Sequence, residues 1–358
     1  MTMSQHDPLN PPDAVAFFRA ACQAFRQAEQ AAGGTIDRVY RIGGYPVRLR
    51  FAGAALIPRL VPALAHHEAL SDGPPPALSI CLWDSASLGT RMPPPPWSWD
   101  DYRARGEVRG YNDGHISTAF AMGSGVLSLL DASQNLALYW VHDARQLPAY
   151  ESGAPLLTIF SWWMGRHDRQ LVHAGAVGLP AGGVLLAGRG GTGKSTTALS
   201  CLHSPLSYVS DDYCLLATKP GPYAYSLYNS AKLDAESLRR LPHLAPALAQ
   251  ADQLDGGKTL LFLRERYPDS ITTGFPVRAI LLSRVTGRVE TTVRPASPTE
   301  GLKALAPSTI FQLSGAHHAA LQTMAQVVKQ VPCYHLELGT EVSRIPEVIA
   351  GVLSACNP

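Results

Sequence analysis

A glycine-rich segment in the middle of the chain has the residue types and the spacing of a phosphate-binding loop. It reads Gly-Arg-Gly-Gly-Thr-Gly-Lys-Ser and matches the pattern G-x-x-x-x-G-K-S at every fixed position. In such a loop the glycines let backbone amides turn toward phosphates, the lysine contacts the terminal phosphates, and the next hydroxyl binds Mg²⁺. We therefore expect ATP and Mg²⁺ as cofactors. The expected nucleotide-binding residues are Gly188, Arg189, Gly190, Gly191, Thr192, Gly193, Lys194, Ser195 and Thr196.

Two adjacent aspartates, Asp211 and Asp212, follow this loop closely and interrupt an apolar segment, Leu-Ser-Tyr-Val-Ser-Asp-Asp-Tyr-Cys-Leu-Leu. One helix and one tight connection fill the gap after Lys194, so we expect the aspartate strand beside the strand that enters the loop. One carboxylate would then hold Mg²⁺, directly or through water, and the other would accept a proton from an attacking hydroxyl. The alternative is that both acids end a strand and face solvent.

Three further residues are candidates because of their surroundings. His173 lies in the apolar segment Leu-Val-His-Ala-Gly-Ala-Val-Gly-Leu, which predicts one strand next to the strand of the loop. A lone histidine in such a strand is typically a hydrogen-bonded core residue. Lys232 and Lys258 each follow a loop and could place a cation near the γ-phosphate, where negative charge spreads during transfer. Both lysines also fit an ordinary exposed surface.

The elements around the loop predict an α/β fold. An apolar strand, Gly-Gly-Val-Leu-Leu-Ala, runs into the glycines, and a helix should begin at Lys194. Further strands are expected at Val-Arg-Ala-Ile-Leu-Leu-Ser-Arg-Val and Pro-Cys-Tyr-His-Leu-Glu-Leu-Gly, and a closing helix near the C-terminus. We assign residues 151–358 to this catalytic domain and residues 1–150 to a smaller α+β accessory domain.

The accessory domain has its own signals. An N-terminal helix with helical apolar spacing precedes an alternating segment that should form a hairpin turning at Gly43-Gly44. Prolines 93–96, followed by Trp97 and Trp99, predict an extended surface loop held by its tryptophans, with a recognition arm as the alternative. The separateness of this domain makes it a candidate for holding a substrate peptide.

Together, His-Ala-x-x-Val, Gly-x-x-x-Thr-Gly-Lys-Ser and Val-Ser-Asp-Asp resemble the catalytic domain of HPr kinase/phosphorylase, whose P-loop fold is similar to that of ATP-dependent phosphoenolpyruvate carboxykinase. The overall layout is closest to the related kinases of ribosomal peptide pathways, notably the lasso-peptide precursor kinases. The resemblance implies transfer of the γ-phosphate of ATP to a serine of a peptide or small protein. It assigns His173 and Asp212 to a catalytic proton relay, and Ser195 and Asp211 to Mg²⁺.

The resemblance has limits that bear on substrate. The chain lacks the family's glycine-rich signature after the aspartates and its basic C-terminal segment, so neither HPr as substrate nor the reverse phosphorylase activity is predicted. Two other functions remain open from the residues alone: a P-loop ATPase acting as a nucleotide switch, and a kinase of a small metabolite. Partitioning ATPases carry a string similar to Gly-Gly-Thr-Gly-Lys-Ser-Thr, but they usually have the loop near the N-terminus and place their metal-binding acid far downstream.

Composition narrows the partners. The 358 residues carry a formal net charge of +2 with no run of lysine or arginine, so we expect no nucleic-acid partner. No apolar run reaches the roughly 18 residues of a membrane span, and the N-terminus lacks the pattern of a signal peptide. The sequence therefore predicts a cytoplasmic protein without a membrane partner. A homo-oligomer is open.

Overall fold

The computed structural model describes residues 13–70, 73–254, 257–315 and 317–356, and its architecture is mixed α/β with three sheets. Over these ranges, no helix combines the length and the apolar character that crossing a bilayer requires. The chain divides into two compact units. The first contains the residues up to Arg38, 48–56 and 77–147, and the second contains residues 39–47, 57–76 and 148–358.

The sequence predicted a single boundary at residue 150. The structure differs, because two early segments belong to the second unit. Hydrogen bonds within that unit give the reason. In residues 39–47, the Tyr45 hydroxyl donates to the His167 carbonyl at 2.8 Å. In residues 57–76, the Pro62 carbonyl accepts from Asn229 Nδ2 at 2.8 Å. Such long-range bonds are not readable from local sequence patterns.

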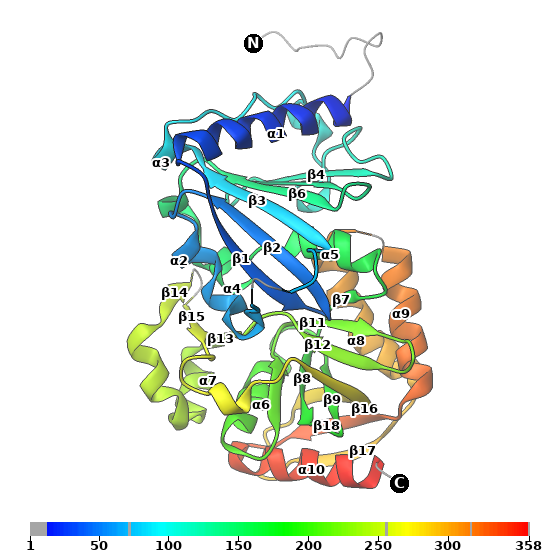
Figure 1. The fold of residues 1–358 in the computed structure, drawn as a ribbon. Helices are drawn as coiled ribbons and strands as arrows, with labels where there is room; N and C mark the ends of the chain where they lie inside the picture. Colours follow the sequence, from blue (N-terminus) through cyan, green and yellow to red (C-terminus); the bar gives the residue numbers. More distant parts are fainter. Residues whose placement is uncertain (1–12, 71–72, 255–256, 316, 357–358) are drawn as a thin grey trace. The chain divides into compact units, whose positions relative to one another are not determined.

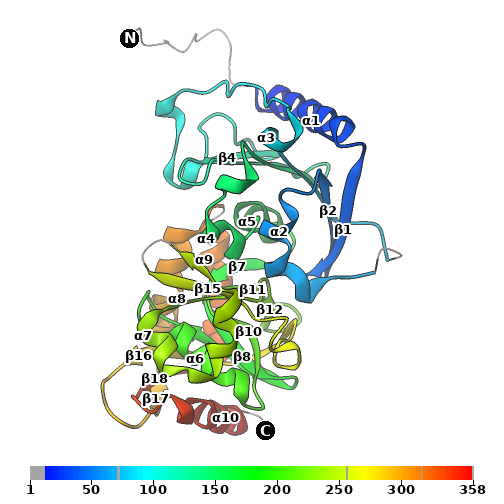
Figure 2. The ribbon, with the colours of Figure 1, turned by 90° about the vertical axis from the view of Figure 1, so that its left-hand side faces the viewer.

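The six-stranded sheet has the strand order β1-β2-β3-β6-β5-β4 (Figures 1 and 2). β3 and β6 pair in parallel, whereas β4, β5 and β6 pair antiparallel. Short helix α3 (Ser85–Leu88) follows β3. The strands are β1 (Thr35–Ile42), β2 (Tyr45–Ala52), β3 (Leu78–Asp84), β4 (Ile116–Ala121), β5 (Val126–Asp131) and β6 (Leu136–Val141).

Helix α1 (Ala14–Ala31) confirms the expected N-terminal helix and closes the core of the first unit. The Asp13 carboxylate caps its start by accepting a 2.8 Å hydrogen bond from the Ala16 amide. Apolar residues at helical spacing, among them Phe17 and Phe25, are buried along one face. The Phe25 ring meets Trp83 of β3 edge-on, with 5.6 Å between ring centroids.

Two other expectations for this half can be compared with the structure. The hairpin is confirmed, because β1 and β2 flank Gly43 and Gly44, whose φ angles of 58° and 90° suit the turn. The proline segment has no regular secondary structure, as expected. Only one tryptophan holds it, however, since Trp97 is buried and Trp99 is 74% exposed.

The nine-stranded sheet of the second unit runs in the order β10-β8-β9-β16-β12-β11-β7, and β18 joins it by pairing with β16 and with β17. β9, β16 and β18 pair in parallel. The expected strands near residues 280 and 335 are confirmed as β16 and β18. The strands are β7 (Gln170–His173), β8 (Gly175–Leu179), β9 (Gly182–Ala187), β10 (Ser207–Ser210), β11 (Tyr213–Ala217), β12 (Tyr223–Ser226), β16 (Gly274–Val285), β17 (Thr292–Ala296) and β18 (Cys333–Leu338).

Helices bury both faces of this sheet (Figure 1). Val184 and Leu186 of β9 pack in one core with α6 (Lys194–Ser200) and the expected closing helix α10 (Ile345–Cys356). Leu185 and Ala187 pack in the other core with α8 (Pro298–Gln312) and α9 (His317–Gln330). A strand buried on both faces is apolar throughout, which is why β9 reads as a continuous apolar run.

The remaining elements complete the second unit. A three-stranded sheet has the order β13-β15-β14, with all pairs antiparallel. Its strands are β13 (Ser230–Asp234), β14 (Asp252–Leu254) and β15 (Lys258–Phe262). The short helices are α2 (Ile57–Leu60), α4 (Ala149–Gly153), α5 (Leu157–Gly165) and α7 (Ala235–Arg240).

Two expectations about strand neighbours are wrong. The apolar segment around His173 forms two strands, β7 and β8, at different positions in the sheet, and β7 pairs with β11 rather than with β9. The strand before the aspartates, β10, pairs with β8, so β8 lies between it and β9. Apolar periodicity identifies buried strands but carries no information about which strand lies next to which.

Candidate active site

The glycine-rich loop connects β9 to α6, as its sequence predicts. Gly191 and Gly193 have φ angles of 79° and 92°, a region that side-chain-bearing residues avoid. The ammonium of Lys194 donates to the carbonyls of Gly188 at 2.8 Å and Arg189 at 3.1 Å. The lysine therefore sits inside the curve of the loop, with its charge directed at the loop backbone.

The other residues of the loop divide by exposure. Gly190 and Gly191 are exposed, and so is Arg189, whose carbonyl faces Lys194. The Thr192 hydroxyl donates to the Arg189 carbonyl at 2.9 Å and so closes the loop internally. The Thr196 hydroxyl lies 3.2 Å from the hydroxyl of Ser237 in α7. Among these side chains, only that of Lys194 is buried.

The two aspartates occupy the short connection between β10 and β11, and they have different partners. Asp211 is 3% exposed, and its Oδ1 accepts a 2.9 Å hydrogen bond from the buried Tyr208 hydroxyl. Asp212 Oδ1 lies 2.7 Å from His173 Nε2, and its Oδ2 lies 3.7 Å from Lys232 Nζ. Asp211 is therefore buried, whereas the Asp212 side chain is 29% exposed but is paired with His173 and Lys232.

His173 reaches Asp212 through strand pairing. In the β7–β11 register His173 is opposite Tyr213, the residue that follows Asp212. Its backbone amide donates to the Thr309 hydroxyl of α8 at 3.1 Å, and the residue is 6% exposed. An ionised Asp212 can only accept, so Nε2 carries the proton in this pair. The histidine is thus a buried, oriented donor.

Different surroundings separate the two carboxyl groups electrostatically. Burial and the charge of Asp212 raise the pKa of Asp211 to about 6, although hydrogen bonds from Tyr208 and Ser195 and the charge of Lys232 oppose the shift. Burial would also raise the pKa of Asp212. The His173 hydrogen bond and the charges of Lys232, His173 and Lys194 outweigh burial and hold that pKa below its usual value. Asp212 is therefore ionised at neutral pH.

The loop and the aspartates belong to one electrostatic cluster. Burial lowers the pKa of Lys194, and the nearby charge of Lys258 adds to this effect, whereas Asp212 and Asp211 oppose it. Lys258 itself is exposed on β15. Of the two candidate lysines, Lys232 on β13 is the one that contacts a carboxylate. A cavity of about 10 Å³, lined by Asp211, Asp212 and Lys232, is the size of one water molecule.

The oxygen donors fit Mg²⁺ better than a transition metal. The Ser195 hydroxyl is close enough to Asp211 to lower the pKa of that carboxyl by hydrogen bonding. Mg²⁺ is usually held by one or two such groups together with substrate phosphates and waters. No cluster of three or more histidine, cysteine, aspartate or glutamate side chains suited to a metal occurs in the described ranges. The donor set agrees with a metal that arrives with a nucleotide.

Tyr208 is a site residue that the sequence reasoning did not single out. Its hydroxyl lies 2.9 Å from both Asp211 Oδ1 and the Ser230 carbonyl, and it is fully buried. Burial raises its pKa well above the usual value. The available signal was a tyrosine in an otherwise apolar strand, since a buried phenol needs a polar partner. Here that partner is the aspartate three residues later.

Comparison with known proteins adds no relative: no protein-family model matches the chain, and neither does any curated protein. A functional assignment must therefore rest on the residues and their geometry.

Proposed function

We propose that the protein is an ATP- and Mg²⁺-dependent kinase that transfers the γ-phosphate to a serine hydroxyl of a peptide or small protein. One observation carries this proposal: the pair of His173 and Asp212, joined at 2.7 Å, belongs to the same charged cluster as Lys194 of the phosphate loop. A switch or simple ATPase needs the loop and a metal-binding acid. Transfer to an alcohol also needs a proton acceptor, and a second, ionised carboxylate oriented by a histidine can supply it.

Each residue has one task in this reaction. Lys194 and the loop amides would bind the phosphates, and Ser195 and Asp211 would hold Mg²⁺, which would neutralise charge that develops on the phosphate oxygens. Asp212 accepts the proton of the serine hydroxyl while the serine oxygen bonds to the γ-phosphorus. The bond from that phosphorus to the β–γ bridging oxygen breaks, and ADP leaves. His173 keeps the carboxylate oriented.

The resemblance to HPr kinase/phosphorylase supports the same assignment, with its P-loop fold and its relation to lasso-peptide precursor kinases. Two features agree with that family more than with partitioning ATPases. The aspartates follow the loop closely in sequence, and Asp212 lies beside Lys232. The proposed acceptor, a serine of a peptide, is more specific than the geometry alone requires, because a small alcohol presents the same hydroxyl group. A serine peptide is the substrate that the resemblance favours.

A direct assay separates the candidate functions. The full chain is incubated with ATP, Mg²⁺ and a library of serine-containing peptides, and both ADP and phosphopeptide are measured by mass spectrometry. The proposal expects ADP formation that depends on peptide, with one phosphate gained per peptide. ADP formation at the same rate without peptide would instead identify an ATPase. A library without serine is the matched control, since it offers the same charges and lengths without that acceptor.

A further inference from the structure

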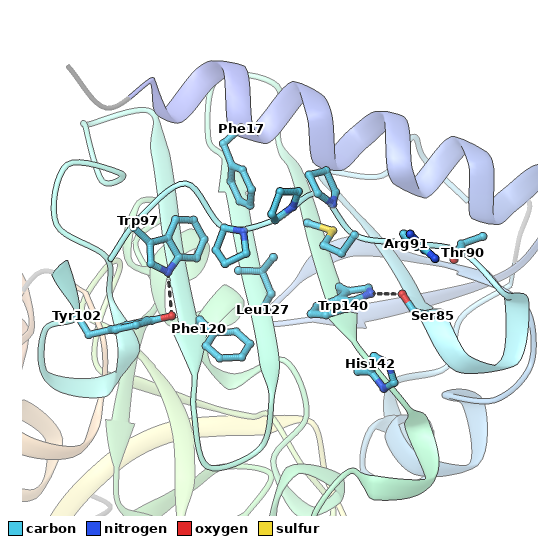
Figure 3. A pocket seen from close by; sticks show the side chains of 14 residues that line it. Phe17, Ser85, Thr90, Arg91, Trp97, Tyr102, Phe120, Leu127, Trp140 and His142 are labelled. Carbon is cyan, nitrogen blue, oxygen red and sulfur yellow. Dashed lines mark hydrogen bonds between the residues drawn. The ribbon is translucent and has the colours of Figure 1, made fainter. Parts of the chain in front are cut away.

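The first unit contains an apolar cavity of about 370 Å³ that the proposed chemistry does not use (Figure 3). Its walls come from α1, β5 and β6 and carry Phe17, Leu127 and Trp140. Pro93, Pro94 and Pro95 also line it. Ligand-binding pockets typically measure roughly 300–1,000 Å³ and are lined mainly by apolar and aromatic side chains. The cavity therefore has the size and lining of a binding site.

Most polar groups in the wall of this cavity already have hydrogen-bond partners. The Trp97 indole donates to the Tyr102 hydroxyl at 2.8 Å, and the Trp140 indole donates to Ser85 Oγ at 2.9 Å (Figure 3). The prolines have no amide hydrogen to donate. An occupant of the interior must therefore be apolar, since a polar group there would lose its bonds to water without replacement.

Aromatic contacts hold the wall in shape. The Trp97 ring meets Phe17 edge-on, with 4.9 Å between centroids, and meets Tyr111 at 5.2 Å. Such contacts stabilise ring pairs beyond simple burial. Trp97 is only 8% exposed, so it belongs to the core of the unit rather than to a mobile surface arm. The cavity is preformed.

One end of the cavity is polar. Thr90 and Arg91 lie together at this end, and His142 lies on the same side (Figure 3). Arg91 is exposed and forms no ion pair with any residue in the described ranges. The buried Thr90 hydroxyl also has no hydrogen-bond partner there. A cation and a free hydroxyl next to an apolar pocket complement a ligand that ends in a carboxylate.

We propose that this cavity is a docking site for the substrate peptide, and that it takes a large apolar side chain followed by an acidic residue. The inference rests on the proposed function, because a peptide kinase must hold its substrate beyond the reacting serine. The cavity beside the aspartates, at about 10 Å³, has no room for a peptide side chain. The larger cavity has that room, and Arg91 supplies the complementary charge.

The test measures binding without ATP. The full chain is titrated by calorimetry with acetyl-Gly-Phe-Glu-Gly-amide and with versions carrying Ala for Phe or Gln for Glu. We expect the Phe probe to bind ~10- to 200-fold more tightly than the Ala probe, as for an apolar side chain in a fitted pocket. Replacing Glu by Gln should weaken binding by ~2- to 5-fold, since Arg91 is exposed and its ion pair is screened.

Two variants test whether the peptide probes bind in this cavity. Leu127→Trp fills the interior and should abolish the difference between the Phe and Ala probes, provided that a thermal melt shows a folded protein. Arg91→Gln changes only an exposed side chain and should abolish the difference between the Glu and Gln probes. Arg109→Gln is the matched control, because Arg109 is exposed in the same unit but does not line the cavity.

The outcomes separate this inference from the proposed function. Equal affinity for the Phe and Ala probes overturns the docking site, and so does binding of phenylacetate when no peptide binds, which would indicate a small-acid ligand. Peptide binding by a protein that never phosphorylates peptides supports the docking site and overturns the kinase. Peptide phosphorylation with an unchanged KM in both Leu127→Trp and Arg91→Gln overturns only the docking site.

Discussion

Asp212 and Asp211 are adjacent in sequence, and yet their pKa values are shifted in opposite directions. Asp212 faces His173 and Lys232, two groups that stabilise its ionised form, whereas Asp211 is buried against Tyr208 and the charge of its neighbour. Carboxyl groups whose pKa values are pushed apart are typical of sites that divide a reaction between them. In the proposed reaction this difference favours Asp212 as the proton acceptor and Asp211 as a metal ligand.

Asp212→Asn removes the proton acceptor but keeps the size and shape of the side chain. We expect the transfer rate to fall by ~10²- to 10⁴-fold, the usual cost of losing a general base, while ATP affinity changes little. Phosphopeptide formation and nucleotide affinity measure the two effects. Asp269→Asn, at an exposed aspartate of the same unit, should retain full activity. An active Asp212→Asn enzyme would show that another group accepts the proton.

Lys232→Met keeps the length of the side chain and removes its charge. Lys232 Nζ lies 3.7 Å from Asp212, so in the proposed reaction the ammonium would stabilise negative charge that develops during transfer. Loss of one such stabilising group typically lowers kcat by ~10²- to 10³-fold. Steady-state kinetics should detect this loss with a smaller change in KM. Lys303→Met, at an exposed lysine of α8, provides the comparison, and equal kcat values in the two variants would remove Lys232 from the site.

At the scale of elements, the turn from β9 into α6 is a place where backbone conformation limits the sequence of the candidate site. Gly193 combines a φ of +92° with a close neighbour, since a Cβ there would lie 2.5 Å from Leu338 Cδ1. Gly190 has no such φ, and a Cβ there would meet nothing within 4 Å. Two glycines of one loop therefore tolerate side chains very differently.

Gly193→Ala should destabilise the protein more than Gly190→Ala. The left-handed backbone alone costs an alanine roughly 1–2 kcal/mol, and the contact with Leu338 adds to that cost. Thermal or urea unfolding without nucleotide measures the difference, so the result does not depend on phosphate contacts. Similar unfolding free energies for the two variants would contradict the strain that the loop geometry implies.

The sequence predicted elements better than it predicted their arrangement. The strand, loop and helix around Lys194 were correct because local spacing specifies them, and the candidate residues His173 and Asp212 do contact each other. Their strands were placed beside β9, however, whereas the contact arises from the pairing of β7 with β11. Tyr208 was missed because its partner depends on a turn that apolar periodicity does not describe.

At the scale of the whole molecule, the second unit holds two adjacent histidines in residues 57–76, of which His66 is half-buried and His67 is buried. His66 Nε2 lies 2.7 Å from Ser226 Oγ, and His67 is 3% exposed. Burial lowers the pKa of His67 to about 4, and burial, with smaller effects from His67 and Arg264, lowers the pKa of His66 well below its usual value. Both are neutral in the folded protein and would take up protons on unfolding in mild acid.

This arrangement makes stability depend on pH. Below a pH of about 6.5 the two histidines bind more protons in the unfolded chain than in the folded one, so their contribution to the unfolding free energy should fall as the pH decreases toward 4, whereas Asp211, whose pKa is raised to about 6, contributes in the opposite direction. For His67 alone the loss is on the order of 3 kcal/mol. Urea unfolding between pH 7 and pH 4 measures it. His67→Leu should flatten the slope and His115→Leu, at an exposed histidine, should keep it. A wild-type slope in His67→Leu would contradict the assignment.

The strand pairing that joins His173 to Asp212 has a consequence for turnover. His173 is fixed by the β7–β11 register and by its contact with α8, and Asp212 is held by its contact with His173, so no nucleotide is needed to assemble the pair. Lys194, in contrast, donates hydrogen bonds to loop carbonyls, and its ammonium would have to release these carbonyls to bind phosphate. Reorganisation during the catalytic cycle should therefore be confined to the loop, and amide exchange should slow there when ATP binds while β7 and β11 stay equally protected.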